Sequence, residues 1–235
     1  EMRYFLNRLY SNHRNTNTKI WDLRIGVHTG AVIAGAIGKK KISYDIWGDT
    51  VNIASRMESS GAIGKVNISA STYHLVKDFF VCLYRGKMPI KYKGEVDMYF
   101  VEGIKPDLSI DRKGNEPNDK FLIKLALLQT EDIKDHIGER MKNSHNKIMR
   151  FHNYKRVERI AKQAELLAEG EKLNDLDTLL IKTSAIFILS GYMFTTQHVK
   201  EASINYMKEL LPEYEYKHEQ TEKISNLIQH FHCEL

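Results

Sequence analysis

The chain has 235 residues, of which 42% are hydrophobic, and it carries a formal net charge of +5 at pH 7. This length suffices for two ordinary domains, and the apolar share argues against a disordered chain. The longest basic run is confined to residues 38–41, GKKK, so the mild positive charge predicts no nucleic-acid partner.

The cysteines and the apolar segments indicate the compartment. Cys82 and Cys233 lie far apart without a CxxC pattern, which fits a reducing cytoplasm and excludes a disulfide framework. The longest apolar stretch, residues 179–194, is interrupted by the polar residues 182–184. It therefore predicts a buried helix, and we expect a cytoplasmic chain without a membrane segment, although an upstream anchor is compatible with this sequence.

The first half of the chain alternates short apolar runs with helical stretches. Residues 23–28 and 31–37 are apolar and are separated by Thr29-Gly30, which predicts a β-hairpin. The other elements expected are a helix within 1–17, a helix at 50–59 capped by Asp49 or Thr50, a strand at 66–69, a helix at 70–77 capped by Ser69 or Ser71, and strands at 79–84, 90–92 and 96–101. Because hairpins join several of these elements, the sheet should be largely antiparallel.

Residues 43–57, SYDIWGDTVNIASRM, place a carboxylate, an amide and a guanidinium at fixed offsets. Asn52 and Arg56 are four residues apart, so a helix places both on one face. Asp45 lies on the strand or turn before that helix. A guanidinium can hold phosphoryl oxygens, an amide can orient a sugar, and a carboxylate can accept from a base amino group. The alternative is an ordinary solvated helix face.

The same run closely resembles the signature of class III adenylate/guanylate cyclases. Residues 23–38, LRIGVHTGAVIAGAIG, are similar to the paired strands that precede the signature in this family. Residues 61–69, GAIGKVNIS, and 91–103, KYKGEVDMYFVEG, are similar to its closing strands. The resemblance covers residues 1–104 and implies an α+β fold with a ferredoxin-like cyclase sheet, present in part.

The resemblance also assigns roles to individual residues. Asp45 is similar to the adenine-reading residue, Asn52 to the residue that positions the ribose and its 3′-hydroxyl, and Arg56 to the residue that neutralises the α-phosphate. Lys93 resembles the lysine that holds the triphosphate, and Lys91 is the neighbouring alternative. The implied reaction converts ATP, or alternatively GTP, into the cyclic nucleotide and pyrophosphate, as in intracellular signalling.

In the family, two metal-binding aspartates precede the helix that residues 2–9 resemble. We therefore expect a fragment of a longer cyclase that binds no metal and is inactive alone. The full-length enzyme would use Mg²⁺ or Mn²⁺ and act as a head-to-tail homodimer, in which one partner supplies the metal carboxylates and the other Asn52 and Arg56. The acidic residues that remain have capping or surface explanations: Asp49, Glu58, Glu95 and Asp97.

Residues 105–118 contain two prolines, a glycine and several charges without apolar periodicity, which predicts a linker. From residue 119 to 235 the pattern becomes all-helical. The expected features are an apolar stripe of Phe121, Leu122, Leu125 and Leu128 continued by Ile133, Ile137 and Met141, a helix at 154–169 with Val157, Ile160, Ala161, Ala164, Leu167 and Ala168 facing inward, and helices at 176–189 (capped by Asn174 or Asp175), 201–211 and 220–231.

This helical half resembles an HD-type phosphohydrolase domain, in residues 151–168, 179–191, 197–203 and 210–216. The resemblance breaks at the metal-binding His-Asp pair, which aligns with Ile188 and Leu189. Neither side chain can ligate a metal. His152 and His198 match histidines of the family, and we expect them to be remnants or ordinary polar residues. The implied domain is non-catalytic, serves regulation, dimerisation or ligand sensing, and has a core that packs without water.

Three functions follow from these patterns. The first is an adenylate cyclase, or alternatively a guanylate cyclase, whose helical half regulates it. The second is a cyclase-like pseudoenzyme that serves as a nucleotide-binding or dimerisation scaffold. The third, an HD-type phosphodiesterase, is disfavoured by Ile188 and Leu189. The intact set of four site residues favours the enzyme: Asp45, Asn52, Arg56 and Lys93.

Overall fold

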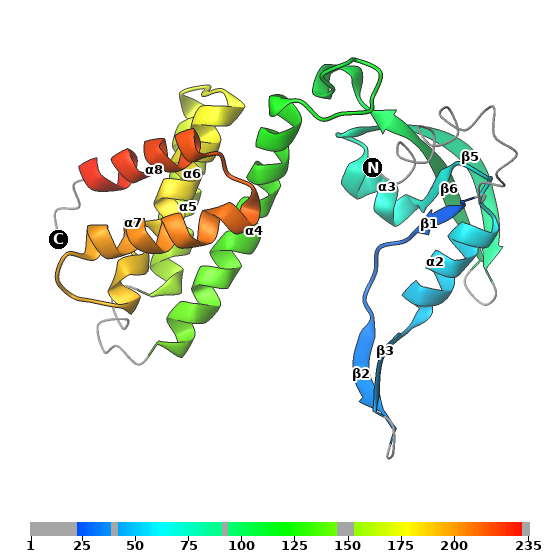
Figure 1. The fold of residues 1–235 in the computed structure, drawn as a ribbon, viewed down its shortest axis with the longest axis horizontal. Helices are drawn as coiled ribbons and strands as arrows, with labels where there is room; N and C mark the ends of the chain where they lie inside the picture. Colours follow the sequence, from blue (N-terminus) through cyan, green and yellow to red (C-terminus); the bar gives the residue numbers. More distant parts are fainter. Residues whose placement is uncertain (1–22, 39–41, 91–93, 145–152, 232–235) are drawn as a thin grey trace, which may run out of the picture. The chain divides into compact units, whose positions relative to one another are not determined.

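A computed structural model of the chain describes residues 23–38, 42–90, 94–144 and 153–231. The chain divides into two compact units (Figure 1), Glu1–Phe121 and Leu122–Leu235. We call them the sheet unit and the helical unit, and each is described by itself.

The sheet unit contains a four-stranded sheet and a separate two-stranded hairpin. Its elements are β1 (Ile25–Val27), β2 (Ile33–Ile37), β3 (Ser43–Trp47), α2 (Asp49–Ser59), β4 (Val66–Ser69), α3 (Ala70–Val76), β5 (Phe80–Ile90), β6 (Gly94–Ile104) and the 3-10 turn η1 (Pro106–Leu108). The strand order is β1-β4-β6-β5, and β2 pairs with β3 alone. The β1–β4 pair is parallel and the other pairs are antiparallel, which confirms a largely antiparallel sheet.

The predicted hairpin between residues 23–28 and 31–37 is wrong. β1 pairs with β4, and β2 pairs antiparallel with β3, so that the GKKK run lies between β2 and β3. The end of β1 is tied to the end of β4, because His28 Nδ1 lies 2.7 Å from Ser69 Oγ. Thr29 Oγ1 lies 3.1 Å from Thr72 Oγ1 in α3. The chain therefore leaves the sheet at Thr29-Gly30 instead of folding back.

Two further expectations about strands and caps need correction. The predicted interruption after residue 84 is wrong, because β5 runs without a break from Phe80 to Ile90, and its pairing with β6 shifts register between Tyr84 and Gly86. Residues 91 and 92 of the predicted strand at 90–92 lie outside the described residues. Helix α2 begins after Gly48 without a side-chain cap. The Thr50 hydroxyl donates instead to the carbonyl of Ala31, at 2.6 Å. Ser69 does cap α3, as predicted, by accepting from Thr72 N.

Helix α2 packs directly on the four-stranded sheet. Ile53 and Met57 point inward and form a small core with Met98 of β6. The helix backbone touches β1 at Gly26, where a Cβ atom would lie 2.0 Å from Glu58 N. Only glycine permits this approach, so Gly26 sets how closely α2 lies on the sheet.

The segment predicted as a linker lies within the sheet unit and is internally hydrogen-bonded. Gly114 O accepts from Ile104 N at 3.0 Å, and Leu108 is only 3% exposed. Hydrogen bonds from Ser109 and Asn115 hold the pKa of the Asp111 carboxyl well below its usual range.

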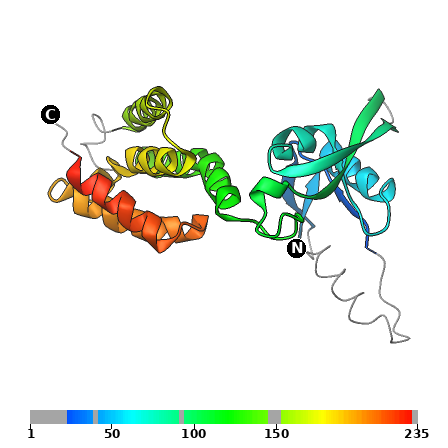
Figure 2. The same ribbon diagram turned by 90° about the horizontal axis from the view of Figure 1, so that it is seen from above.

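The helical unit is a bundle around one apolar core, and Figure 2 shows its helices from above. Its elements are α4 (Asp119–Asn143, which begins in the sheet unit), α5 (Tyr154–Gly170), α6 (Asp175–Phe187), η3 (Ser190–Met193), α7 (Val199–Leu210), η4 (Leu211–Tyr214) and α8 (His218–His230). Asn174 caps α6 as predicted, because its Oδ1 accepts from Asp177 N at 2.9 Å. Phe187, which is fully buried, and the adjoining Ile188 and Leu189 belong to the core.

Two inward-facing positions predicted in this unit are wrong. Leu128 is 58% exposed and Leu167 is 66% exposed. In α4 the buried face comprises Ala126, Thr130, Ile133, Ile137, Gly138 and Met141. That spacing places Leu128 on the opposite side of the helix.

Among the described residues, Asp175–Met193 is long and apolar enough to cross a membrane by length and composition, and 61% of its most apolar window is buried. The central helix of a helical bundle has the same properties, and this segment contributes much of the core. The expected lack of a membrane segment stays a prediction.

Gly26→Ala should destabilise the sheet unit by about 1–3 kcal/mol, because the added methyl group meets helix backbone that cannot rotate away. Urea denaturation followed by tryptophan fluorescence would measure this, since Trp47 lies in β3 of this unit. Gly170→Ala is the control, because a Cβ there has no atom within 4 Å. Equal midpoints for wild type and Gly26→Ala would contradict the close approach of α2.

Leu189→Asp should destabilise the helical unit by about 3–5 kcal/mol, because the carboxylate would be buried without a partner. Leu189 is 6% exposed. Leu167→Asp places the same charge at a position that is 66% exposed, where a change within about 0.5 kcal/mol is expected. Far-UV circular dichroism during urea denaturation compares the two variants, and similar midpoints would argue against a dry core at position 189.

Glu165 on α5 should make the helical unit sensitive to acid. Hydrogen bonds from Lys162 and Lys182, at 2.8 Å and 3.0 Å, lower the pKa of its carboxyl to about 2. Because the folded-state pKa lies below the unfolded value of about 4.3, the stabilisation is complete above about pH 5 and is lost as the pH falls toward 2.

Glu165→Gln should therefore be less stable than wild type at pH 7, and the difference should shrink between about pH 5 and pH 2. Lys182→Met, which removes the partner on α6, should show the same convergence. Urea denaturation at a series of pH values measures both variants. A stability difference that stays constant over this range would show that the ion pair does not contribute.

Candidate functional site

The predicted site residues lie on consecutive elements of the sheet unit. Asp45 is in β3, and Asn52 and Arg56 are in α2, which follows β3 after Gly48. All three side chains are exposed. Lys93 and its alternative Lys91 lie outside the described residues. The structure therefore brings three of the four predicted residues onto one strand–helix segment.

The two faces of α2 have different tasks. Ile53 and Met57 are buried against the sheet, and Asn52 and Arg56 precede them by one residue each. One residue is a rotation of about 100° around the helix, so Asn52 and Arg56 lie together beside the buried face, one turn apart. Among the described residues, neither side chain forms a hydrogen bond or an ion pair. The guanidinium of Arg56 is thus exposed and can donate two parallel hydrogen bonds to an anion such as a phosphate.

The carboxylate of Asp45 is partly oriented by its own backbone. Asp45 pairs with Gly35 in the β2–β3 hairpin, and its Oδ1 accepts from Ile46 N at 2.8 Å. Its second carboxylate oxygen, Oδ2, takes no hydrogen bond from the described part of the chain. That oxygen can accept from the amino group of a ligand.

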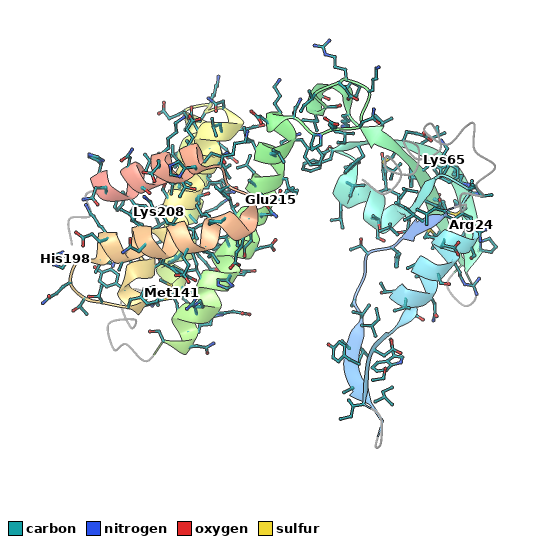
Figure 3. All side chains as sticks on the ribbon, viewed as in Figure 1. Arg24, Lys65, Met141, His198, Lys208 and Glu215 are labelled. Carbon is teal, nitrogen blue, oxygen red and sulfur yellow. The ribbon has the colours of Figure 1, made fainter. Side chains whose placement is uncertain are left out.

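Residues that sequence reasoning missed hold the C-terminal turn of α2. Arg24, which precedes β1, forms an ion pair with Glu58 at 3.1 Å, and Figure 3 shows it beside α2. Arg85 of β5 donates to the carbonyl of Ser60 and lies over the Phe100 ring, 4.6 Å from its centroid. These residues carry no local sequence pattern, because their partners lie on other elements.

The described residues contain no group of three or more His, Cys, Asp or Glu side chains that could hold a metal. All four acidic residues considered from the sequence have partners within the protein. Glu58 pairs with Arg24, Asp97 accepts from the Tyr84 hydroxyl at 2.8 Å, and Glu95 lies 3.7 Å from Lys87. The described residues thus offer side chains that can bind a nucleotide but no metal centre.

The helical unit has no comparable constellation among its described residues. Ile188 and Leu189 are 8% and 6% exposed within the core. His198, labelled in Figure 3, precedes α7 and lies 3.7 Å from Glu201. His152 lies outside the described residues.

A groove of about 740 Å³ between α6 and α8 has a mainly apolar lining that includes Leu180 and Leu227.

Comparison with known proteins identifies the sheet unit. The family model "Adenylate and Guanylate cyclase catalytic domain" matches residues 2–103. An adenylate cyclase of Mycobacterium tuberculosis is 42% identical over 83 residues, which cover 35% of this chain and 19% of that protein. Guanylate cyclase 32E of Drosophila melanogaster is 43% identical over 101 residues, 42% of this chain and 9% of that protein. The chain thus spans a fifth or less of these relatives.

Solved structures give related matches. The guanylate cyclase domain of RhGC from Catenaria anguillulae, in complex with GTP, is 36% identical with a TM-score of 0.36, covering 41% of this chain and 55% of that chain. The adenylyl cyclase CyaB from P. aeruginosa is 34% identical with a TM-score of 0.39, covering 43% and 53%. From the family match and the curated relatives, residues 2–103 are identified as sequence of the class III adenylate/guanylate cyclase catalytic domain.

Proposed function

We propose that this chain supplies the nucleotide-binding half of a cyclase active site that converts ATP into cyclic AMP and pyrophosphate. The observation that carries the proposal is the pair Asn52 and Arg56 on the exposed side of α2, directly after the strand of Asp45. All three lie within the segment that matches the cyclase family.

In the proposed reaction, the ribose 3′-oxygen attacks the α-phosphorus of ATP. The new bond joins the 3′-oxygen to the α-phosphorus, the bond from that phosphorus to the β-phosphate oxygen breaks, and pyrophosphate leaves with that electron pair. The 3′-hydroxyl proton passes to solvent. Negative charge grows on the α-phosphate oxygens as the attack proceeds, and a guanidinium placed there stabilises the transition state more than the substrate.

Each site residue then has one task. Arg56 binds the α-phosphate oxygens through its planar fork. Asn52, one turn earlier on α2, holds the ribose so that the 3′-oxygen faces the phosphorus. Asp45 accepts a hydrogen bond from the adenine amino group. Guanine carries a carbonyl oxygen at that position, which a carboxylate repels, so ATP is the proposed substrate and GTP the alternative. Lys93 is proposed to hold the triphosphate.

Metal ions and a second subunit are proposed for the complete protein. The family resemblance implies Mg²⁺ or Mn²⁺, which would lower the pKa of the 3′-hydroxyl when bound. Since the described residues form no metal-binding group, the ligands would come from elsewhere in a head-to-tail homodimer. The present chain would contribute Asn52 and Arg56 to that shared site.

We propose that the helical unit is a non-catalytic, HD-like regulatory domain. Support comes from the sequence resemblance, which aligns Ile188 and Leu189 with the metal-binding pair, and from the burial of both side chains in the apolar core. Such a domain can regulate by changing its packing or by binding a ligand, and it needs no metal to fold. The proposed location is the cytoplasm.

A second candidate function is a cyclase-like scaffold that binds nucleotide or a partner without turnover. The β2–β3 hairpin supports it, because the hairpin exposes large apolar side chains. Ile33 is 72% exposed, Ile42 75% and Tyr44 74%. Exposed apolar surface of this kind is typical of protein–protein contacts, and it suits a dimer of either an enzyme or a scaffold.

The proposal is tested by incubating the full-length protein with Mn²⁺ and either ATP or GTP. Mass spectrometry then identifies the cyclic product. Wild type should produce cyclic AMP from ATP. Arg56→Ala should lower kcat about 100- to 1000-fold, the usual effect of losing one transition-state donor. Arg159→Ala, an exposed arginine of α5, is the matched control and should retain the wild-type rate.

Asp45→Asn separates substrate choice from catalysis. It should raise the KM for ATP about tenfold, which is the loss of one hydrogen bond to a charged group, roughly 1.5 kcal/mol, and it should narrow the preference for ATP over GTP. No cyclic product from either nucleotide, in a folded protein that binds a fluorescent ATP analogue, would favour the scaffold instead.

A further inference from the structure

Asn67 of β4 is a polar residue that is completely buried beneath α2. Its exposed fraction is 0%. Its Nδ2 donates to the carbonyl of Met57 at 2.8 Å and also approaches the sulfur of Met98 at 3.6 Å. Its Oδ1 is buried and has no hydrogen-bond partner in the described part of the chain. The amide therefore makes one strong contact, and that contact is with the helix that carries the candidate site.

Stability alone does not account for this amide. A buried acceptor without a partner costs at least as much as one ordinary hydrogen bond returns. An apolar side chain of similar size would avoid that cost and would pack against Met57 and Met98. What the amide adds is direction, because its donor points at a single carbonyl of α2.

The carbonyl that Asn67 holds belongs to the last turn of the helix, where carbonyl groups lack partners within the helix. Neighbouring carbonyls are satisfied separately. Ser60 N donates to Arg56 O, Gly61 N donates to Glu58 O, and Arg85 donates to Ser60 O. Asn67 supplies the partner for Met57 from the sheet.

Holding Met57 at its carbonyl restricts how α2 can rotate about its axis. The side chain of Met57 is also fully buried, and Gly26 fixes how closely the adjoining Glu58 approaches β1. Arg56 directly precedes Met57 in the helix. A rotation or shift at Met57 would therefore move the Arg56 guanidinium away from the phosphate that it is proposed to bind.

We propose that Asn67 is a positioning residue for the cyclase reaction, which holds the Met57 carbonyl so that α2 presents Arg56 to the α-phosphate. This inference rests on the proposed function. Asn67 itself is buried and does not reach the nucleotide, so its effect on the reaction passes through α2. Small misplacements of a catalytic group cost far more in rate than in binding.

Asn67→Leu removes the donor and keeps the volume of the side chain. In the full-length protein, kcat for ATP should fall about 10- to 100-fold, while KM stays close to the wild-type value because Asp45, which lies on β3 and not on α2, still binds the base. Hydrogen exchange of the amides in residues 57–61 should become faster. Asn67→Ser, whose hydroxyl is too short to reach the carbonyl, is a second variant in case leucine disturbs folding.

Thr72→Val is the matched control. Thr72 is 5% exposed in the same unit, and its hydroxyl bonds to Thr29 and Ser69, neither of which belongs to α2. It should lose stability and retain kcat. Wild-type kcat in both Asn67 variants, or an equal loss of kcat in Thr72→Val, would overturn the positioning role alone. If wild type produces no cyclic nucleotide at all, the proposed function fails, and the role of Asn67 in the reaction fails with it.

Discussion

The seating of helix α2 on the four-stranded sheet is the contact on which the candidate site depends. The helix is held by apolar packing of Ile53 and Met57, by backbone contact at Gly26 and by polar contacts to its last turn. These interactions leave the side of α2 that carries Asn52 and Arg56 exposed. The helix can thus be rigid where it meets the sheet and accessible where it would meet a nucleotide, which is the arrangement that catalytic positioning requires.

The helical unit follows a different physical principle. Its core is almost entirely apolar, and several buried polar side chains are hydrogen-bonded within it, as in the contact of Thr183 with the Tyr216 hydroxyl at 2.9 Å. Burial raises the pKa of Tyr216 to about 12, and the hydrogen bond with Thr183 opposes this rise. Such a core gains its stability from packing. The regulatory role that we propose for this unit would therefore rest on its packing and its surfaces.

The β2–β3 hairpin of the sheet unit exposes large apolar side chains. It carries Asp45, yet it lies outside the four-stranded sheet and pairs only with itself (Figure 1). A two-stranded ribbon with exposed isoleucines gains little stability alone. If a second subunit covers it, the same association that stabilises the ribbon would also fix the position of Asp45 relative to α2.

The features that could be predicted from the sequence alone are those that depend on interactions between residues close together in the chain. The helix that carries Asn52 and Arg56 at a four-residue spacing, and the caps at Ser69 and Asn174, involve residues close together in the chain, and the structure has each of them. The tertiary structure alone decided the parallel pairing of β1 with β4, the exposure of Leu128 and Leu167, and the burial of Asn67 under α2. These features depend on contacts between distant segments, such as His28 with Ser69. Neither periodicity nor spacing along the chain contains that information, because it arises only when the elements pack.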